Sequence, residues 1–267
     1  MLLIRLCFAA LFSLLTVNLW AADTIRQRRT VVVDGTLEEW TLRWSGPVRP
    51  VCSALEMTQA VTCPCSGFTY GEQGHLFLER KHNDALLESM DLSPLFAEFD
   101  NPADNGNAAL VLLPRRLNDP SDDFGDRTKV REFEIELRKR SPVDVMDLRD
   151  FTQDGMKASF LLQVGNVPCG KQEAMLIGIS RKFPKLHAFS TAAHPERPLV
   201  LQRGAWMALL AAGRKTTITD LACGDHGSEN EIEQIIYSHE GSFSVRENTY
   251  SCEKDGARGP QLRSVDK

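Results

Sequence analysis

The residues in this sequence best suited to chemistry lie in two short loops. Cys223-Gly224-Asp225-His226-Gly227 places an acid beside a histidine, a pair that can bind a metal or act in proton transfer. Asp150-Phe151-Thr152-Gln153-Asp154-Gly155 places oxygen-bearing side chains at alternate positions and a glycine at the sixth. Calcium takes roughly six to eight oxygen ligands, and a loop of this pattern supplies several from one face. The first loop therefore indicates acid–base or metal chemistry, and the second indicates a cation site.

The remaining histidines form no recognised catalytic motif. His187 and His194 bracket Ser190, but the sequence has no His-Glu-x-x-His helix, no Gly-x-Ser-x-Gly turn and no glycine-rich phosphate loop. An exported hydrolase that uses His226 with Asp225, or His187, is the enzyme that remains open. An enzyme would gather these groups in one pocket, whereas a binding module would leave them dispersed. The sequence favours the binding module.

The cation loop lies between two apolar segments. Val145-Met146-Asp147-Leu148 precedes it and Phe160-Leu161-Leu162-Gln163-Val164 follows it. This unit of strand, Asp-rich loop and strand resembles the FG-GAP or VCBS-type calcium-binding repeats, from Asp150 to Val164. The resemblance implies a propeller-like β scaffold that binds calcium through Asp150, Thr152 and Asp154, and a role in binding protein or carbohydrate. Thr152 and Ala158 stand where the family usually has acids, so the alternative is that the two aspartates only cap a turn.

A second segment is similar to this loop. Asp100, Asp104 and Gly106 precede an apolar strand at Ala108 to Leu113, and Asp100 lies 50 residues before Asp150. A period of this length suits a repeat whose unit is a small antiparallel sheet.

The N-terminus has the layout of a Sec signal peptide. A basic start at Arg5 is followed by an apolar run from Leu6 to Leu19 and by the small pair Ala21-Ala22. The run is shorter than the about 20 apolar residues needed to span a bilayer. We expect residues 1–22 to be removed and the mature protein to be periplasmic or secreted. Cys7 precedes any cleavage point, so no lipoprotein anchor is expected.

The cysteines agree with an oxidising compartment. The mature chain keeps an even number of them, which predicts up to three disulfides among Cys52, Cys63, Cys65, Cys169, Cys223 and Cys252. Cys63-Pro64-Cys65 is too tight for an internal bridge, so each of the two should pair with a distant cysteine. The pairing expected is Cys52 with one of them, Cys169 with the other, and Cys223 with Cys252. A thiol–disulfide exchanger that uses Cys63 and Cys65 is the alternative.

Composition and pattern predict a mainly β domain. Loss of Arg5 takes the net charge from −5 to −6, which argues against a nucleic-acid partner. Period-two alternation and turn residues predict strands throughout, at 30–33, 39–44, 75–79, 108–113, 131–137, 143–148, 159–164, 174–179, 186–189, 216–221, 231–237 and 242–250. Asp34-Gly35 and Glu240-Gly241 predict hairpin turns. A helix is expected over Gln202 to Ala212, ending at Gly213, and another turn of helix within Leu86 to Phe99.

We therefore expect antiparallel sheets in a propeller-like or sandwich arrangement, with one or two short helices. Residues 23–252 should form one domain, or two subdomains, and 253–267 a flexible polar tail. Trp40 and Trp44 share one side of a strand, as in a sugar-stacking platform or, more commonly, a core. The function expected is that of an exported, disulfide-stabilised binding or envelope-associated protein.

Overall fold

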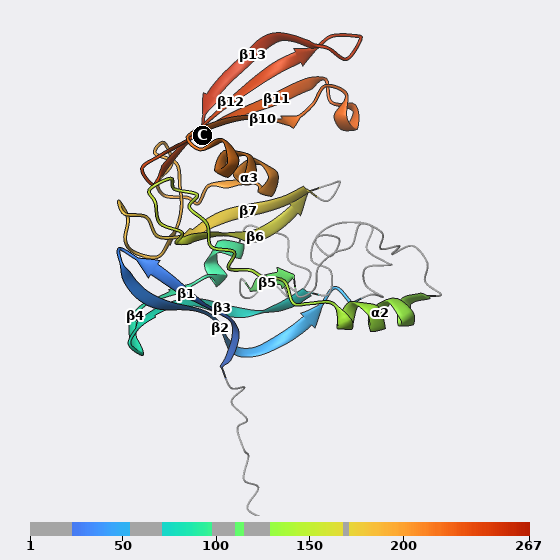
Figure 1. Cartoon of the computed structure of the whole chain (residues 1–267). Helices are drawn as coiled ribbons and strands as arrows, with labels where there is room; N and C mark the ends of the chain where they lie inside the picture. The colour runs from blue at the N-terminus through green and yellow to red at the C-terminus, as the bar shows by residue number, and fades with distance from the viewer. Residues whose placement is uncertain (1–22, 54–70, 98–109, 115–128, 168–170) are drawn as a thin grey trace, which may run out of the picture.

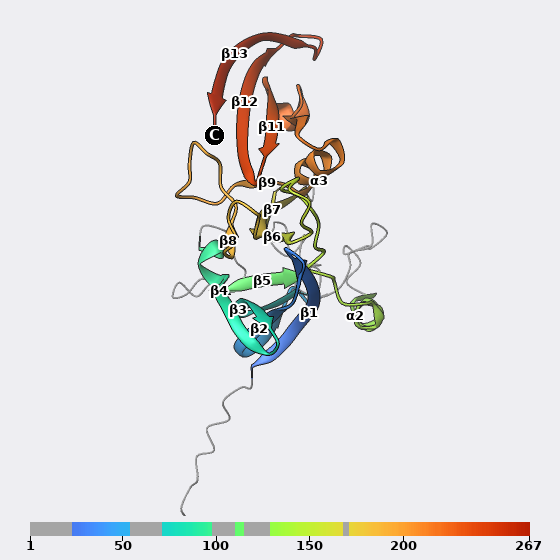
Figure 2. The same ribbon diagram turned by 60° about the vertical axis from the view of Figure 1, so that its left-hand side comes forward.

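The structure is a computed structural model that describes residues 23–53, 71–97, 110–114, 129–167 and 171–267. These residues form three antiparallel β-sheets, which Figures 1 and 2 show stacked in layers, and two short α-helices. The mainly β fold class predicted from the sequence is confirmed. Residues 1–22, Cys63, Cys65, Cys169 and the segment around Asp100 lie outside the described residues.

The N-terminal sheet has the strand order β1-β2-β3-β4, and β5 pairs with the start of β3. Its strands are β1 (Thr24–Val33), β2 (Thr36–Val51), β3 (Gly71–His82), β4 (Ala85–Asp91) and β5 (Val111–Pro114). Asp34 and Gly35 have φ values of 46° and 81°, which are typical of the tight turn that the sequence predicts here. Asn83 and Asp84, with φ values of 47° and 62°, form an equivalent turn that the sequence pattern did not reveal.

The middle sheet is short and lies between the other two. It has the order β6-β7-β8, and β9 also pairs with β7. Its strands are β6 (Ser159–Val167), β7 (Lys171–Gly178), β8 (His187–Ala188) and β9 (Val200–Gln202). Gly178 ends β7 with a φ of 149°, and a Cβ there would lie 2.2 Å from the Ala158 carbonyl oxygen. Only glycine fits this close approach of two backbones.

The C-terminal sheet is a four-stranded meander in the order β10-β11-β12-β13. Its strands are β10 (Lys215–Leu221), β11 (Asn230–His239), β12 (Ser242–Cys252) and β13 (Arg258–Asp266). The predicted Glu240-Gly241 turn joins β11 to β12, with φ values of 47° and 79°. The expectation of a flexible tail at 253–267 is wrong, because β13 pairs with β12. Its polar side chains are held by cross-strand ion pairs, such as that of Arg258 with Glu233.

Two helices and two 3-10 turns complete the part of the chain that the structure describes. They are η2 (Ser93–Phe96), α2 (Val130–Lys139), α3 (Arg203–Ala212) and η5 (Asp225–Gly227). The predicted helix α3 is confirmed, and the N–H of Gly213 closes it on the Leu209 carbonyl at 2.9 Å. η2 lies within the segment expected to hold a turn of helix.

Two predicted strands are wrong. Residues 131–137 belong to α2, where glutamate, leucine and arginine have high helix propensity. Ile135 is about half exposed, so its alternation with charged residues does not reflect one-sided burial in a sheet. Residues 143–148 form an irregular segment with a bend at Val145 instead of a strand.

The middle sheet contributes to both hydrophobic cores. One core packs it against the N-terminal sheet, and it contains Trp40, Leu42 and Leu78 together with Phe160 and Ile177. The other core packs its opposite face against α3 and the C-terminal sheet, with these main members: Leu161, Leu176, Trp206, Leu209, Ile236 and Phe243. Burial on both faces explains the continuous apolar runs of β6 and β7. Trp40 and Trp44 are 0% and 2% exposed, so they are core residues and form no sugar-stacking platform.

A buried ion pair fastens the N-terminal sheet to the loop that follows β7. Arg80 donates to both carboxylate oxygens of Glu38 at 2.8 Å. It also donates to Glu88 at 3.0 Å and to the Pro184 carbonyl at 2.9 Å. Burial acts to raise the pKa of Glu38, but hydrogen bonds from Arg80 and Trp40 lower it overall. A buried charge pair of this kind is compensated only while both partners are present.

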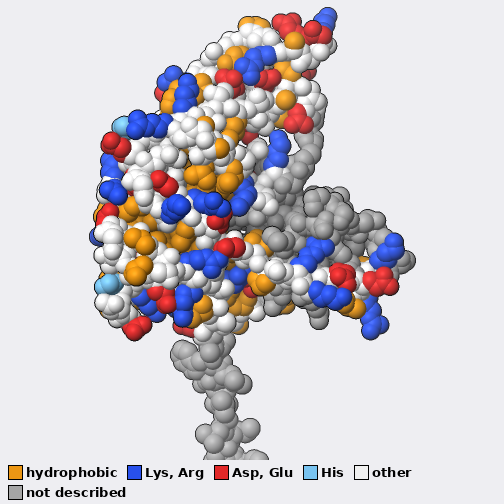
Figure 3. Space-filling view, in the orientation of Figure 1, with side chains coloured by type: hydrophobic (Ala, Val, Ile, Leu, Met, Phe, Trp, Pro, Cys, Tyr) orange, Lys and Arg blue, Asp and Glu red, His pale blue; other side chains and the backbone are white. Residues whose placement is uncertain are grey.

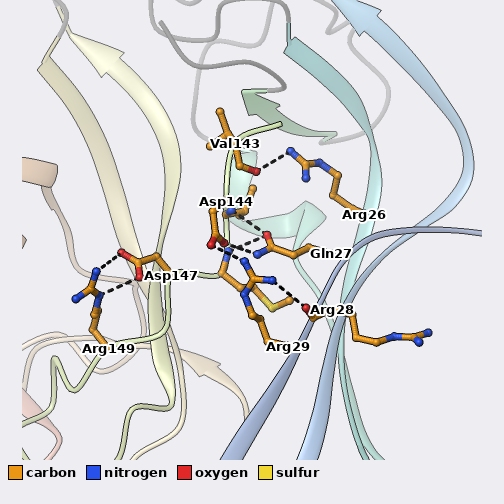
Figure 4. Close-up of polar contacts among 10 residues, drawn as sticks. Arg26, Gln27, Arg28, Arg29, Val143, Asp144, Asp147 and Arg149 are labelled. Atoms are coloured by element: carbon orange, nitrogen blue, oxygen red, sulfur yellow. Dashed lines mark hydrogen bonds and ion pairs between the residues drawn. The ribbon is translucent and has the colours of Figure 1, made fainter. Parts of the chain in front are cut away.

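The edge of β1 is covered by the irregular segment that precedes the Asp150 loop (Figure 4). A bulge interrupts the pairing of β1 between Ile25 and Gln27, and Arg26 within it donates to the Val143 carbonyl at 3.1 Å. The Gln27 side-chain oxygen accepts the N–H groups of Val145 and Met146 at 2.9 and 3.0 Å. Gln27 and Arg29 also bind the Asp144 carboxylate. These bonds fix the path by which the chain enters the middle sheet.

Candidate functional site

A cavity of about 510 Å³ lies where elements of all three sheets meet. The N-terminal sheet contributes η2, which follows β4, and the middle sheet contributes β7, β9 and the loop between β8 and β9. The C-terminal sheet contributes Lys267, directly after β13. The described residues lining the cavity are Pro94, Leu95, Ala97, Met175, Thr191, His194, Glu196, Arg197, Pro198, Leu199, Val200 and Lys267. Its volume is that of an ordinary small-molecule site.

One part of the lining is apolar and held by regular structure. Met175 on β7 and Val200 on β9 are paired across the sheet. Leu95 comes from η2, where Pro94 stands in the first turn, a position at which proline needs no N–H partner. The Asp91 carboxylate accepts the N–H of Ser93 at 2.8 Å and thereby starts this turn. The apolar wall is therefore preformed.

The other part of the lining is polar and belongs to the loop between β8 and β9. The buried Thr191 hydroxyl accepts the N–H of His194 at 3.1 Å, and His194 Nδ1 lies 3.2 Å from a carboxylate oxygen of Glu196. A backbone N–H, together with His194 and Arg197, lowers the pKa of Glu196. Main-chain bonds from Ala192 to Phe243 and from Leu199 to Phe189 tie the loop at both ends.

The two cations of the lining differ in their partners. Lys267 forms an ion pair with Glu247 on β12 and donates its N–H to the Val245 carbonyl at 2.8 Å. The exposed Arg197 guanidinium makes no hydrogen bond or ion pair with any residue in the described part of the chain. Among the described lining residues, Arg197 is thus the cation whose guanidinium can donate hydrogen bonds to a ligand.

Partly buried carboxylates lie behind Lys267, at the seam between the middle and C-terminal sheets. Burial raises the pKa of Glu173 on β7, and the Asp220 carboxylate adds to the rise. Burial likewise raises the pKa of Asp220 on β10, with Glu247 adding to it and Lys171 and Lys267 opposing it. Gln202 and Gln234 donate side-chain hydrogen bonds to Asp220. Carboxyl groups with shifted pKa values are frequent in functional sites.

The Asp150 loop is closed on itself by hydrogen bonds. The Asp150 carboxylate accepts the N–H groups of Asp154 and Gly155 at 3.1 and 2.9 Å. The Asp154 carboxylate accepts those of Met156 and Arg181 at 2.9 and 2.7 Å. Thr152 is fully buried, and its hydroxyl lies 3.4 Å from Asp150. The described residues contain no cluster of three or more His, Cys, Asp or Glu side chains suited to a metal. Both aspartates therefore cap the turn, and calcium binding stays a prediction.

Of the histidines considered for catalysis, His194 lines the cavity and His187 does not. The ring of His187 packs against Phe189 in a tilted arrangement, 4.2 Å between centroids, and its Nδ1–H donates to the Lys185 carbonyl at 2.7 Å. Burial lowers the pKa of His187. Asp225 lies 3.8 Å from Lys171 in an ion pair, and His226 shares its 3-10 turn. His187 and Asp225 thus have separate sets of partners.

One predicted disulfide is confirmed. Cys223 and Cys252 are joined, with their Cα atoms 5.5 Å apart, and the bridge ties the loop after β10 to the end of β12. Cys52 is also disulfide-bonded, to a partner outside the described residues. Cys223 belongs to the loop considered for metal or acid–base chemistry. Because its sulfur is bonded to Cys252, it is not a free thiolate that could bind a metal.

Sequence reasoning missed most of the cavity. Arg197, Lys267 and Met175 belong to no motif, and only the fold brings them together. His194 was singled out as a candidate, but for catalysis with Ser190. On the face shown in Figure 3, basic and acidic side chains are interspersed, so no broad area of one charge marks a site there.

Comparison with known proteins adds no identity: no family model, curated protein or solved structure matches the chain. Within the described residues, no helix is long and apolar enough to cross a membrane.

Proposed function

We propose that the chain is an exported, disulfide-stabilised and envelope-associated binding module whose ligand occupies the cavity of about 510 Å³ between the three sheets. The observation that carries the proposal is the construction of the lining. An apolar wall on regular elements faces a polar loop tied at both ends, with a cation that no described residue pairs. Preformed apolar concavities with few polar groups are the usual form of small-molecule sites.

Two features support the export part of the proposal. Residues 1–22 have the charge, apolar run and small residues of a signal peptide. The Cys223–Cys252 bridge is of a kind that persists mainly in oxidising compartments.

Binding is favoured over hydrolysis because His187 and Asp225 have separate partners, and His194 is the candidate histidine that the described lining contains. His187 packs between Phe183 and Phe189, while Asp225 faces Lys171. Neither His187 nor Asp225 lines the cavity. A hydrolase needs its base, nucleophile and substrate site in one place.

The test uses the fluorescent probe 8-anilinonaphthalene-1-sulfonate, which carries apolar rings and one anionic group. We expect the folded protein to bind it at a single site with increased fluorescence. Ala97→Trp places a large side chain at an exposed lining position and should abolish this binding. Ala211→Trp, at an exposed position of α3 outside the lining, is the matched control and should bind the probe normally.

Circular dichroism of both variants establishes that each is folded, which matters because partly unfolded proteins also bind this probe. Equal probe binding by Ala97→Trp and the wild type would show that the cavity is not the site.

A further inference from the structure

We infer that the ligand of the cavity is an anionic amphiphile, with an apolar chain against the wall of η2, β7 and β9 and an anionic head at Arg197. The inference rests on the proposed function and names the ligand class for the same site.

The charged side chains of the lining favour a ligand with an anionic head group. Glu196 supplies the acidic side chain of the described lining, and it already interacts with His194 at 3.2 Å. Arg197 offers its guanidinium without a hydrogen bond or ion pair to a described residue. Lys267 adds a second positive charge, partly offset by Glu247 from outside the lining. A cationic head would face two positive groups, whereas a carboxylate or phosphate would gain charge-assisted hydrogen bonds.

The apolar wall selects a flexible chain over a sugar. Its described members are aliphatic: Pro94, Leu95, Ala97, Met175, Pro198, Leu199 and Val200. The lining contains no Trp, Tyr or Phe in its described part, the side chains on which sugar rings commonly stack. Methionine adapts its shape to irregular apolar partners, which suits an alkyl chain.

The polar and apolar parts come from different elements, so an extended ligand can satisfy both. The loop between β8 and β9 carries Arg197 directly before Pro198 and Leu199, and these lead into β9. Arg197 therefore lies where the polar loop joins the apolar wall. A head bound at Arg197 leaves the attached chain next to that wall.

The experiment compares probes with the same ten-carbon chain and different heads, each below its micelle concentration, by isothermal titration calorimetry. The probes are decanoate, decyl phosphate, decanol and decyltrimethylammonium. Decanoate and decyl phosphate should each bind about tenfold more tightly than decanol, as expected for a charge-assisted contact. Decyltrimethylammonium should bind more weakly than decanol.

Two arginine variants assign the head group. Arg197→Gln should reduce the affinity for decanoate about tenfold, to that of decanol, and circular dichroism should show that the variant is folded. Arg214→Gln changes an exposed arginine outside the lining and should leave all affinities unchanged.

The outcomes separate this inference from the proposed function. Decyltrimethylammonium binding as tightly as decanoate, or an Arg197→Gln variant that keeps the preference for decanoate, would overturn the anionic class and leave the binding site intact. If the wild type binds neither the four probes nor the anilinonaphthalene probe, the proposed function fails with it.

Discussion

Arg80 shows how much one buried side chain can determine. Its guanidinium is bound by Glu38, Glu88 and the Pro184 carbonyl, so it connects the N-terminal sheet to the loop after β7. We expect Arg80→Met to lower the free energy of unfolding by about 3–5 kcal/mol, because Glu38 would keep an uncompensated buried charge. Urea unfolding followed by tryptophan fluorescence measures the loss.

The double variant Arg80→Met/Glu38→Met should recover most of that stability, since it removes both charges. Arg28→Met is the exposed control. Its pair with Glu39 is open to solvent, and its loss should cost less than about 1 kcal/mol. A double variant no more stable than Arg80→Met alone would contradict this account of the pair.

The Asp150 turn gives a second prediction at this scale. Asp150→Ala removes the acceptor of two backbone N–H groups and should destabilise the protein by about 1–2 kcal/mol in excess chelator. Asp150→Asn keeps one acceptor oxygen and should lose less stability. Thermal unfolding in excess chelator measures both losses.

Thermal unfolding with added calcium tests the cation site. A working site would raise the melting temperature of the wild type and not that of Asp150→Ala, whereas no rise in millimolar calcium would leave the aspartates with the turn alone.

Glu173 makes stability depend on pH. Because its pKa is raised in the folded protein, the neutral form is favoured there. The stabilisation is fully present below the ordinary pKa of 4.5 and is lost as pH rises through the folded value. Glu173→Gln should therefore raise the melting temperature at pH 7 and leave it almost unchanged at pH 4. Glu229→Gln, at an exposed site, is the control, and an equal effect of Glu173→Gln at both pH values would contradict the sign.

At the scale of elements, Gly178 fixes the junction of β6 and β7. Any Cβ there would collide with the Ala158 carbonyl at 2.2 Å and also requires an unfavourable φ of 149°. We expect Gly178→Ala to cost more than about 3 kcal/mol in free energy of unfolding. Gly204→Ala is the matched substitution in α3, where a Cβ meets nothing within 4 Å, and it should raise stability by up to about 1 kcal/mol. Denaturant unfolding compares the two, and similar effects would contradict the steric argument.

Elements with local signals could be predicted from the sequence. The Asp34-Gly35 and Glu240-Gly241 turns depend on residues that tolerate positive φ, and α3 on an apolar face closed by Gly213. β13 and α2 could not be predicted from local signals. Whether each segment forms a helix, a strand or a loop depends on its intrinsic propensity and also on contacts with residues far away in the chain. Arg258 on β13 forms ion pairs with Glu231 and Glu233 on β11. These partners lie more than 20 residues away, so no local pattern reveals them.

The candidate site was even less predictable, for the same reason. Asp150, Thr152 and Asp154 are near one another in sequence, so their turn could be predicted. The cavity joins residues from Pro94 to Lys267, and each has an ordinary neighbourhood in the sequence. Only sheet packing brings them to one place.

At the scale of the whole molecule, the Cys223–Cys252 bridge should matter more than any surface ion pair. It joins residues 29 apart in the chain, for which the loop-entropy model gives about 3.6 kcal/mol. The double variant Cys223→Ser/Cys252→Ser should unfold at a lower temperature by calorimetry. A variant as stable as the wild type would mean that strand pairing alone holds the outer end of the C-terminal sheet.

The order of the three sheets along the chain has a consequence for how the protein is made. Each sheet is built from one uninterrupted stretch, Thr24 to Pro114, then Ser159 to Gln202, then Lys215 to Asp266. Because a chain is synthesised from its N-terminus, these stretches emerge one after another, and each can pair its strands before the next arrives. When the middle sheet forms, the N-terminal sheet is already assembled and can cover one of its apolar faces. The other apolar face stays exposed until the C-terminal sheet forms. The period of greatest exposure to aggregation or proteolysis therefore lies between the arrival of β7 and the completion of β12.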